Sequence, residues 1–147
     1  MSREPHRRPE SVLVVVHTAA ADILLLRRFQ PFSFWQSVTG SLHSSEEAAD
    51  AAARELQEET GLTDEGVLSS GGISRHFDID PRWLDRYPPG TIENEEFEWR
   101  YRLPSRRDIR INVDEHSAYR WCQVDEAIES VWSWTNKEAL QSLRREL

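Results

Sequence analysis

Residues 40–62 read GSLHSSEEAADAAARELQEETGL, and this stretch decides the fold. Its section 46–60 is rich in Ala, Glu, Leu and Gln and lacks Gly and Pro, so it predicts a helix. The serines at 44–45 can supply the N-cap, and Gly61 stands where a left-handed C-terminal cap belongs. The apolar stripe of this helix is expected to consist of Ala49, Ala52, Ala53 and Leu56. The stretch therefore predicts a loop, a helix and a second loop.

Three carboxylates of this helix share one face. Glu55 and Glu59 are four residues apart, and Glu58 follows Glu55 by three. Like charges at this spacing repel by roughly 0.2–0.5 kcal/mol per pair and raise one another's pKa. A divalent cation removes both penalties, and carboxylate oxygens are ligands that Mg²⁺ prefers. The alternative is a solvated face, which most glutamate-rich helices present.

The residues around these carboxylates stand at fixed offsets. Gly40, Glu46, Arg54 and Gly61 complete the pattern Gly-x5-Glu-x7-Arg-Glu-U-x-Glu-Glu-x-Gly-U, in which U is aliphatic. The pattern constrains nine positions over 23 residues, which a merely solvated helix face does not explain. In these residues the sequence resembles the Nudix hydrolases. Many members carry Gly where this chain has Ser45, a departure that makes the loop turn less permissive but removes no ligand.

The resemblance implies a fold and a chemistry. The fold is of the α/β (α+β) class: an α/β/α sandwich with a mixed sheet and a loop–helix–loop catalytic motif. The activity is hydrolysis of a nucleoside diphosphate linked to another group, with Mg²⁺ as cofactor and Mn²⁺ as a substitute. The implied metal ligands are the backbone of Gly40 and the carboxylates of Glu55, Glu58, Glu59 and Glu115. The implied catalytic residues are Arg54, which orients the carboxylates, with Glu58, Glu59 and Glu115.

The identity of the general base stays open at this point. Within the family the base varies, and Glu58 or Glu59 of the helix can serve. Two candidates lie outside the motif, Glu115 and Glu96. Glu115 precedes the last predicted strand, where a loop residue can reach a site on a neighbouring element.

A narrower resemblance within the family extends from about Arg7 to Lys137. It rests on Arg8-Pro9, FWQSVTG at 34–40, YPPG at 87–90, EH at 115–116, AYRW at 118–121 and SWTN at 133–136. It implies that the substrate is a pterin triphosphate of folate biosynthesis, cleaved to the monophosphate and pyrophosphate. The substrate-binding residues that it implies are Arg7, Arg28, Thr39, Phe77, Asp78, Ile79, Asp80 and Ser133.

Two alternatives to this function are retained. The first keeps the chemistry but replaces the pterin with a canonical or oxidised nucleoside triphosphate or a dinucleoside polyphosphate. The second is a non-catalytic module that binds nucleotides, which the intact set of carboxylates disfavours. Relative turnover of a pterin and a purine triphosphate separates the first alternative from the pterin assignment.

The rest of the chain predicts a mixture of strands and helices. Strands are expected at 11–17, 23–28, 34–39, 66–79, 97–103 and 117–124. Short helices are expected at 125–131, capped by Asp125, and at 135–145, and an irregular excursion at 80–91. Gly71-Gly72 predicts a bulge in its strand, and alternating residues at 97–103 predict a half-buried strand. Too few crossover helices are present for a parallel doubly wound sheet.

Composition sets the remaining expectations. The 147 residues suit one domain, 1–147, and the net charge of −8 argues against binding of a nucleic-acid polymer or an anionic membrane. The N-terminal residues lack the apolar run of a signal peptide, and Cys122 is the only cysteine, so a cytoplasmic location is expected. The expected partner is a small-molecule triphosphate, and the oligomeric state is left open.

Overall fold

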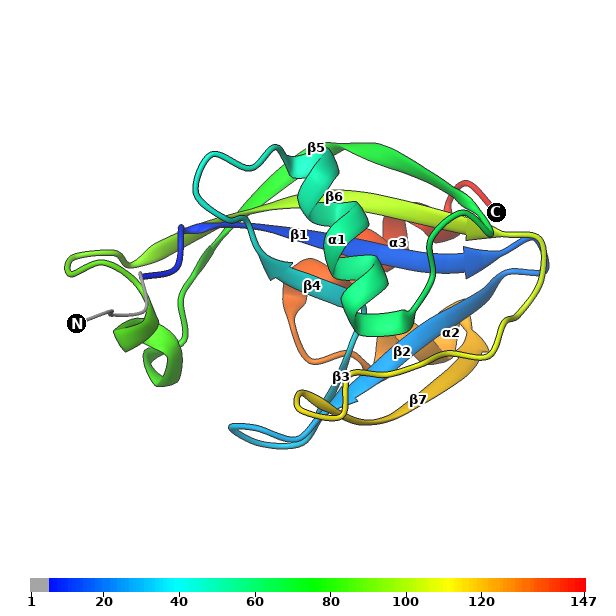
Figure 1. The fold of residues 1–147 in the computed structure, drawn as a ribbon. Coiled ribbons are helices and arrows are strands. Elements are labelled where there is room, and N and C mark those ends of the chain that lie inside the picture. The colour runs from blue at the N-terminus through cyan, green and yellow to red at the C-terminus, as the bar shows by residue number, and fades with distance from the viewer. Residues whose placement is uncertain (1–5) are drawn as a thin grey trace.

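The computed structural model describes residues 6–147 and shows a seven-stranded mixed sheet with helices on both faces (Figure 1). The strands are β1 (Glu10–Thr18), β2 (Asp22–Arg28), β3 (Phe34–Gln36), β4 (Val38–Ser41), β5 (Val67–Asp78), β6 (Glu93–Leu103) and β7 (His116–Gln123). The helices are α1 (Ala48–Thr60), α2 (Val124–Ser130) and α3 (Trp134–Arg144), with the 3-10 helix η1 (Pro81–Arg86). Within these residues, no helix combines the length and hydropathy that crossing a membrane requires. The architecture confirms the predicted α+β sandwich.

The sheet divides into two arms because β1 and β2 diverge. β1 pairs in parallel with β6 along its whole length, but pairs with β2 only beside their turn, where His17 faces Ile23. Away from that turn, β4 pairs with β1 and β3 pairs with β2 (Figure 1). β7 extends the second arm by pairing with β2. The chain passes from one arm to the other at Ser37, between β3 and β4.

Two apolar cores fill the two faces of the sheet. α1 covers one face, where its Ala52 and Leu56 pack with Val12 and Val14 of β1. On the other face, α2 and α3 pack against the alternate residues of β1, such as Leu13. β1 is therefore buried on both sides, as its continuous apolar run predicts.

The helix caps differ from the prediction at their N-terminal ends. α1 begins after Glu47, which makes no side-chain capping hydrogen bond, and the serines lie in the loop before it. Ser45 adopts a left-handed φ of 64°, a conformation that glycine adopts more readily than serine. α2 likewise begins after Gln123, so that Asp125 lies in its first turn and not at its cap. The left-handed cap predicted at Gly61 is confirmed, with a φ of 78°.

The predicted apolar stripe of α1 is only half right. Ala52 and Leu56 are buried, but Ala49 and Ala53 are exposed. The buried face includes Glu55 and Glu59 instead. The helix is rotated so that two carboxylates, and not two alanines, point toward the sheet. Apolar periodicity alone does not anticipate this rotation.

The predicted strand 34–39 is in fact two strands. It breaks at Ser37, whose N–H donates to Oδ1 of Asn136 at 2.8 Å. The side-chain amide of Asn136 in turn donates to the Ser37 hydroxyl at 2.9 Å. This pair of bonds from α3 satisfies the backbone at the crossing point, and β4 then continues past Gly40 to Ser41.

β6 is not the half-buried strand that its alternation predicts. Its apolar residues face α1, but Glu96 and Glu98 on the other face are also buried, at 7% and 2% exposure. Glu98 pairs with Arg75 at 2.9 Å and with Arg100 at 3.3 Å. The bulge predicted in β5 is confirmed by a register shift between Ser70 and Ser74.

Candidate active site

A cavity of about 1200 Å³ lies at the divided end of the sheet. It is lined by residues of both arms, by the loop before α1, by the segment around η1 and by the start of α3. Gly40, Glu55 and Glu115 all contribute to its wall. A cavity of this size accommodates a drug-sized or nucleotide-sized ligand. The motif of residues 40–62 therefore borders a space that can hold a substrate.

Gly40 makes room for a carboxylate of α1. A Cβ atom at position 40 would lie 2.1 Å from Cδ of Glu55 and 2.3 Å from its Oε1. No side chain fits at that distance, so any other residue would displace the Glu55 carboxylate. The glycine is required here by this close approach and not by its backbone angles. The backbone of Gly40 and the carboxylate of Glu55 thereby lie side by side.

Arg54 connects the loop to the helix. Its Nε and Nη2 donate to the two carboxylate oxygens of Glu46, each at 2.9 Å, and Nη2 also donates to the Ser41 carbonyl at 3.0 Å. Its Nη1 lies 2.7 Å from Oε1 of Glu55 and 3.3 Å from Oε2 of Glu58. The bidentate pair holds the pKa of Glu46 at about 2. Arg54 thus fixes the orientation of the carboxylates on its own helix.

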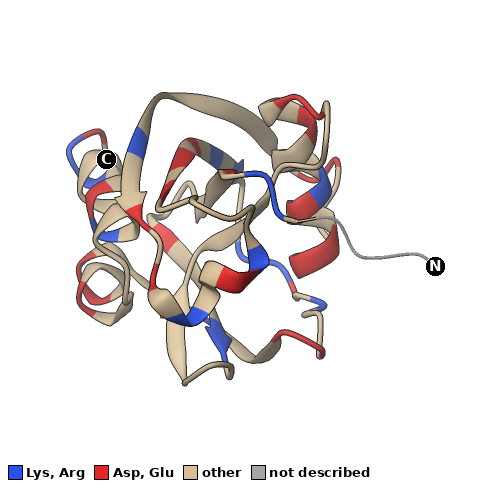
Figure 2. Cartoon of the chain, turned by 90° about the vertical axis from the view of Figure 1, so that its left-hand side faces the viewer, with Lys and Arg blue, Asp and Glu red and all other residues tan. Residues whose placement is uncertain are grey.

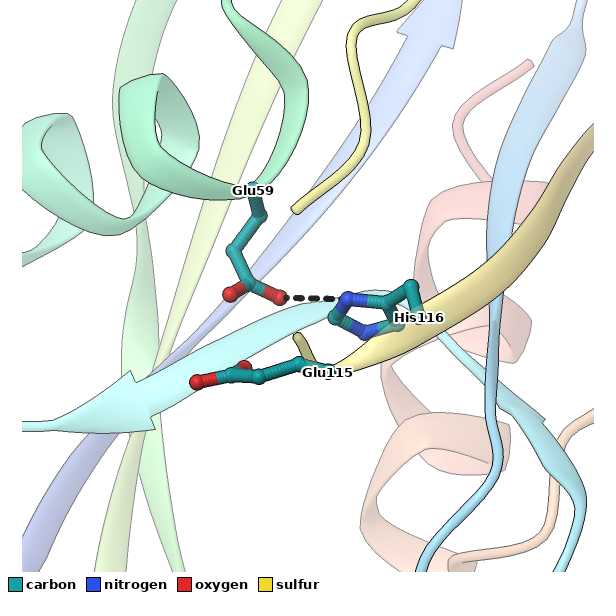
Figure 3. Close-up of side chains that lie close together, drawn as sticks. All are labelled: Glu59, Glu115 and His116. Atoms are coloured by element: carbon teal, nitrogen blue, oxygen red, sulfur yellow. Dashed lines mark ion pairs between the residues drawn. The ribbon is translucent and has the colours of Figure 1, made fainter. Parts of the chain in front are cut away.

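Glu59, Glu115 and His116 converge from two elements far apart in sequence (Figure 3). Glu59 points from the last turn of α1, Glu115 lies in the turn before β7, and His116 begins β7. Their ligand atoms all lie within 4.8 Å of one another. Glu59 and His116 are each 1% exposed, while Glu115 is half-buried and faces the cavity.

Burial dominates the electrostatics of this cluster. It raises the pKa of Glu55 to about 7, although Arg54 opposes the shift. Burial, followed by the neighbouring Glu115, raises the pKa of Glu59 far above its ordinary value. Burial also lowers the pKa of His116 to about 4, so that its ring is neutral near pH 7. In this cluster, burial therefore disfavours the ionised form of the carboxyl groups, which a bound cation would favour.

The donor set fits a divalent cation. Nδ1 of His116 lies 3.2 Å from Oε2 of Glu59, yet neither atom has a hydrogen-bond partner among the described residues. A buried carboxylate oxygen without a partner costs free energy, which a bound cation removes. Oxygen ligands of this kind suit Mg²⁺ and Mn²⁺. Glu55, Glu59 and Glu115 thus present the chemistry that a metal site needs.

Comparison with known protein families agrees with this geometry. The NUDIX domain family matches residues 7–143 of the chain. The chain belongs to the Nudix family. Nudix hydrolases generally use a divalent metal, which agrees with the acidic cluster of this chain.

Nudix relatives of named activity are similar over nearly the whole chain. The dihydroneopterin triphosphate diphosphatase of Escherichia coli K12 is 34% identical over 145 residues, covering 96% of this chain and 95% of that protein. The protein of the same name from Haemophilus influenzae is 31% identical over 140 residues, covering 92% and 87%. The solved structure of the E. coli dihydroneopterin triphosphate pyrophosphohydrolase superposes with a TM-score of 0.90, at 32% identity, covering 98% of this chain and 100% of the other.

The cavity of this Nudix chain brings together the substrate residues predicted from the sequence. Its lining includes Arg7, Arg28, Thr39, Phe77, Asp78, Ile79, Asp80 and Ser133. Four of these side chains already have hydrogen-bond partners, and one is Arg28, whose Nε donates to the Gln30 carbonyl at 3.0 Å. Asp80 accepts from Arg82 at 2.6–2.9 Å and caps η1, while Ser133 accepts from the Asn136 N–H and caps α3. Thr39 donates to a β1 carbonyl.

The candidate bases of the Nudix site lie in different surroundings. The Glu58 side chain is half exposed and does not line the cavity. Glu96 lines the cavity on the face of β6 opposite to α1. Glu115 lines the cavity beside Glu59. Of the two candidates outside the motif, only Glu115 therefore adjoins the carboxylates of α1.

Sequence reasoning missed two parts of the Nudix site. Arg86 joins Arg7, Arg28 and Glu115 around a second hollow of about 550 Å³ that shares residues with the large cavity. At this end of the molecule, acidic and basic positions are interspersed (Figure 2). Arg86 lies in the excursion 80–91, where no periodic pattern marks a functional position.

The second missed part is an aromatic rim on the cavity. It is formed by Phe34 of β3, Trp83 of η1 and Trp132 before α3. The ring centroids of Phe34 and Trp132 are 5.2 Å apart, and those of Trp83 and Trp132 are 5.9 Å apart. These distances are typical of interacting aromatic pairs. Because the three residues come from separate segments, only the folded chain assembles the rim.

Proposed function

We propose that this chain is a Mg²⁺-dependent pyrophosphohydrolase that converts dihydroneopterin triphosphate to the monophosphate and pyrophosphate in folate biosynthesis, with residues 1–147 acting as one Nudix domain. The observation that carries the proposal is the meeting of Glu59 with Glu115 and His116 at the wall of a cavity that is also lined by arginines and aromatic rings. The similarity to enzymes named for this substrate supports the choice of a pterin. Residues 1–5 lie outside the described structure.

The proposed metal ligands are the Gly40 backbone and the carboxylates of Glu55, Glu58, Glu59 and Glu115. Glu55 and Glu59 are held in place before any cation binds, because both are buried and Arg54 contacts Glu55 at 2.7 Å. Glu58 is half exposed, and its one ion pair among residues 6–147 is with Arg54 at 3.3 Å. The bound cation would neutralise phosphate charge and increase the acidity of water at the site. Mn²⁺, which accepts the same oxygen ligands, is expected to substitute.

The arginines are proposed to bind the phosphate tail. Arg7, Arg28 and Arg86 surround the hollow that adjoins Glu115. Burial, and to a smaller extent the charges of Arg7 and Arg86, lower the pKa of Arg28. Mutual repulsion of this kind is relieved by an anion that lies among them. Guanidinium groups bind phosphate oxygens in a bidentate manner, which would align the tail with the carboxylates.

Glu115 is proposed as the general base. It is half-buried, lines both hollows and lies beside Glu59, so its carboxylate oxygen can accept a proton from a water molecule that attacks the phosphate tail. Glu96 is less suited to this step because it lies on the other face of the sheet from α1. Arg54 acts as a positioning residue, since it contacts Glu55 and Glu58 and does not line the cavity.

A pyrophosphate-release assay with Mg²⁺ tests the proposal. Dihydroneopterin triphosphate is compared with the common nucleoside triphosphates at equal concentration, with a chelator and the Glu59→Gln variant as controls. A preference of about tenfold or more for the pterin, or about 1.4 kcal/mol, is expected. Equal or better turnover of a purine triphosphate would contradict the assignment to folate biosynthesis, while the assignment as a pyrophosphohydrolase would stand. Tight binding without turnover of any triphosphate would refute catalysis.

A further inference from the structure

The floor of the cavity contains two buried acceptor groups, an amide and a carboxylate, and the amide oxygen has no partner among the described residues. Asn94 and Glu96 are two residues apart on β6 and therefore share one face of the sheet. Both line the cavity, and they are 1% and 7% exposed. Ser11 of the neighbouring strand β1 lies in register with Glu96. These side chains form a polar patch under the aromatic rim.

The side-chain amide of Asn94 donates through its nitrogen, but its oxygen accepts no hydrogen bond from the described residues. Its Nδ2 donates to the Ser11 hydroxyl at 2.8 Å, which fixes the orientation of the amide. Its Oδ1 has no hydrogen-bond partner among the described residues. A buried amide oxygen without a donor costs on the order of 1–3 kcal/mol. The missing donor is therefore expected to come from a ligand.

Glu96 is a buried carboxylate without a direct ion pair among the described residues. No ion pair within residues 6–147 includes it, although its neighbour on the same face, Glu98, has two arginine partners. Burial raises the pKa of Glu96 to about 7, and the hydroxyl of Thr135 and the more distant charge of Arg75 only partly oppose the shift. Such a carboxylate is stabilised most by a ligand that donates hydrogen bonds from two neighbouring N–H groups, one to each oxygen.

We propose that Glu96 and Asn94 recognise the 2-amino-4-oxopyrimidine edge of the substrate ring, which presents a ring N–H beside an amino group. The carboxylate of Glu96 accepts from the ring N–H and from one amino hydrogen, and Oδ1 of Asn94 accepts from the other. Phe34, Trp83 and Trp132 then cover the ring at the rim. The proposal deepens the proposed function and rests on it for the entry of such a ring into this cavity.

The chemistry of the edge excludes several competing rings. Adenine and cytosine present an amino group beside an unprotonated ring nitrogen, whose lone pair faces the carboxylate and repels it. Hypoxanthine keeps the ring N–H but lacks the amino group. Pterin and guanine share the complete edge, so both can donate to the acceptors of Glu96 and Asn94. A site built to receive hydrogen bonds rejects an analogue that lacks a donor, because the buried acceptors then stay unpaired.

The first experiment uses the wild-type protein alone. Values of kcat/KM are measured with Mg²⁺ for dihydroneopterin triphosphate, GTP, ITP and ATP. We expect GTP to exceed ITP and ATP by about tenfold or more, the loss typical of a missing bidentate contact. A GTP-to-ITP ratio near one overturns the proposal without any variant.

The second experiment compares Glu96→Gln with Glu93→Gln. Glu93 lies on the same strand but on its other face, and its side chain is half exposed and outside the cavity lining. The probe is neopterin, which has no phosphate, titrated by fluorescence without divalent cation. We expect Glu96→Gln to weaken neopterin binding by about tenfold or more and to bring the GTP-to-ITP ratio toward one, mainly through KM. The control is expected to change neither value by more than about twofold.

The outcomes separate this inference from the proposed function. If GTP is turned over as well as the pterin, but Glu96→Gln removes the discrimination against ITP, then edge recognition stands and the pterin assignment falls. If the pterin is strongly preferred and Glu96→Gln changes neither neopterin binding nor the ratio, the function stands and the edge recognition is wrong. Thermal melting of each variant identifies misfolding, in which case the wild-type ratios decide.

Discussion

The two ends of the cavity are built in different ways. At the α1 end, the charged groups come mostly from one continuous stretch and are held by ion pairs, with Arg54 contacting Glu46 and Glu55 at 2.7–2.9 Å. At the ring end, the groups come from β1, β3, β6, η1 and the start of α3. The first end is a local motif, whereas the second exists only because distant segments pack together.

This difference has a chemical reason. Hydrolysis of a phosphate anhydride demands the same carboxylate arrangement whatever group carries the phosphates. A short stretch of helix supplies that arrangement, because residues three and four apart share one helix face. Recognition of a ring demands a shape and a set of hydrogen bonds that differ for each substrate. Changes at the α1 end should therefore alter kcat, and changes at the ring end should alter KM. The predictions below test this division.

The largest effect is expected for Glu59→Gln. Loss of this buried carboxylate should lower kcat by about a thousandfold or more, because no other group of α1 replaces it at the cluster. Thermal unfolding in metal-free buffer should be unchanged or shifted to higher temperature, since the variant removes a carboxyl group whose ionisation is disfavoured by burial and then by Glu115. Glu47→Gln, at the exposed start of α1, serves as the control. A large loss of stability in Glu59→Gln would show that the residue is structural.

A smaller effect on rate, with a loss of stability, is expected for Arg54→Gln. The change leaves Glu46 and Glu55 without their partner, so kcat should fall by about a hundredfold and stability by about 1–3 kcal/mol. Combining it with Glu46→Gln closes a double-mutant cycle measured by urea unfolding. The two losses should be strongly non-additive. Simple additivity would contradict the connection between loop and helix.

A still smaller effect, on KM alone, is expected for Trp132→Ala at the ring end. Aromatic stacking on a base contributes about 1–3 kcal/mol, so KM should rise by about tenfold while kcat stays within twofold. Steady-state kinetics with dihydroneopterin triphosphate measure both values. Val67→Ala is the control because this side chain is exposed on β5, outside the cavity lining. A fall in kcat without a change in KM would break the proposed division between the two ends.

The smallest effect on activity is expected at His17, which lies outside the cavity lining. Burial, aided by Arg100 and Arg102, lowers the pKa of His17 from 6.5 to about 4. The unfolded chain therefore binds this proton first as pH falls, so stability is complete above about pH 6.5 and is lost between there and about pH 4.

His17→Phe tests this pH dependence, since phenylalanine does not titrate. The variant should lose less stability than wild type between pH 7 and pH 4, by on the order of 2 kcal/mol, with turnover near pH 7.5 unchanged. Urea unfolding at each pH measures the difference. Parallel pH profiles for the two proteins would show that His17 does not carry the acid sensitivity.

The sequence predicted most of the secondary structure and went wrong where tertiary contacts override local preference. Ser44 and Ser45 resemble a helix cap, but the loop before α1 must also bring Glu46 to Arg54, so the helix begins later. The alternation in β6 predicts a solvated face, yet Glu96 and Glu98 are buried under α3 and a ligand cavity. The first contact lies within the motif but follows no capping pattern, and the second joins segments that are far apart in sequence.

By itself, the sequence determined the catalytic helix, the fold class and the family, because offsets of three and four residues place carboxylates on one helix face whatever surrounds them. Only the tertiary structure decided how Glu115 meets Glu59 and how Asn94 and Glu96 reach the floor of the cavity. These positions depend on the divergence of β1 from β2 and on the packing of α3 against β1. Both arise from long-range burial, which no local pattern of residues encodes.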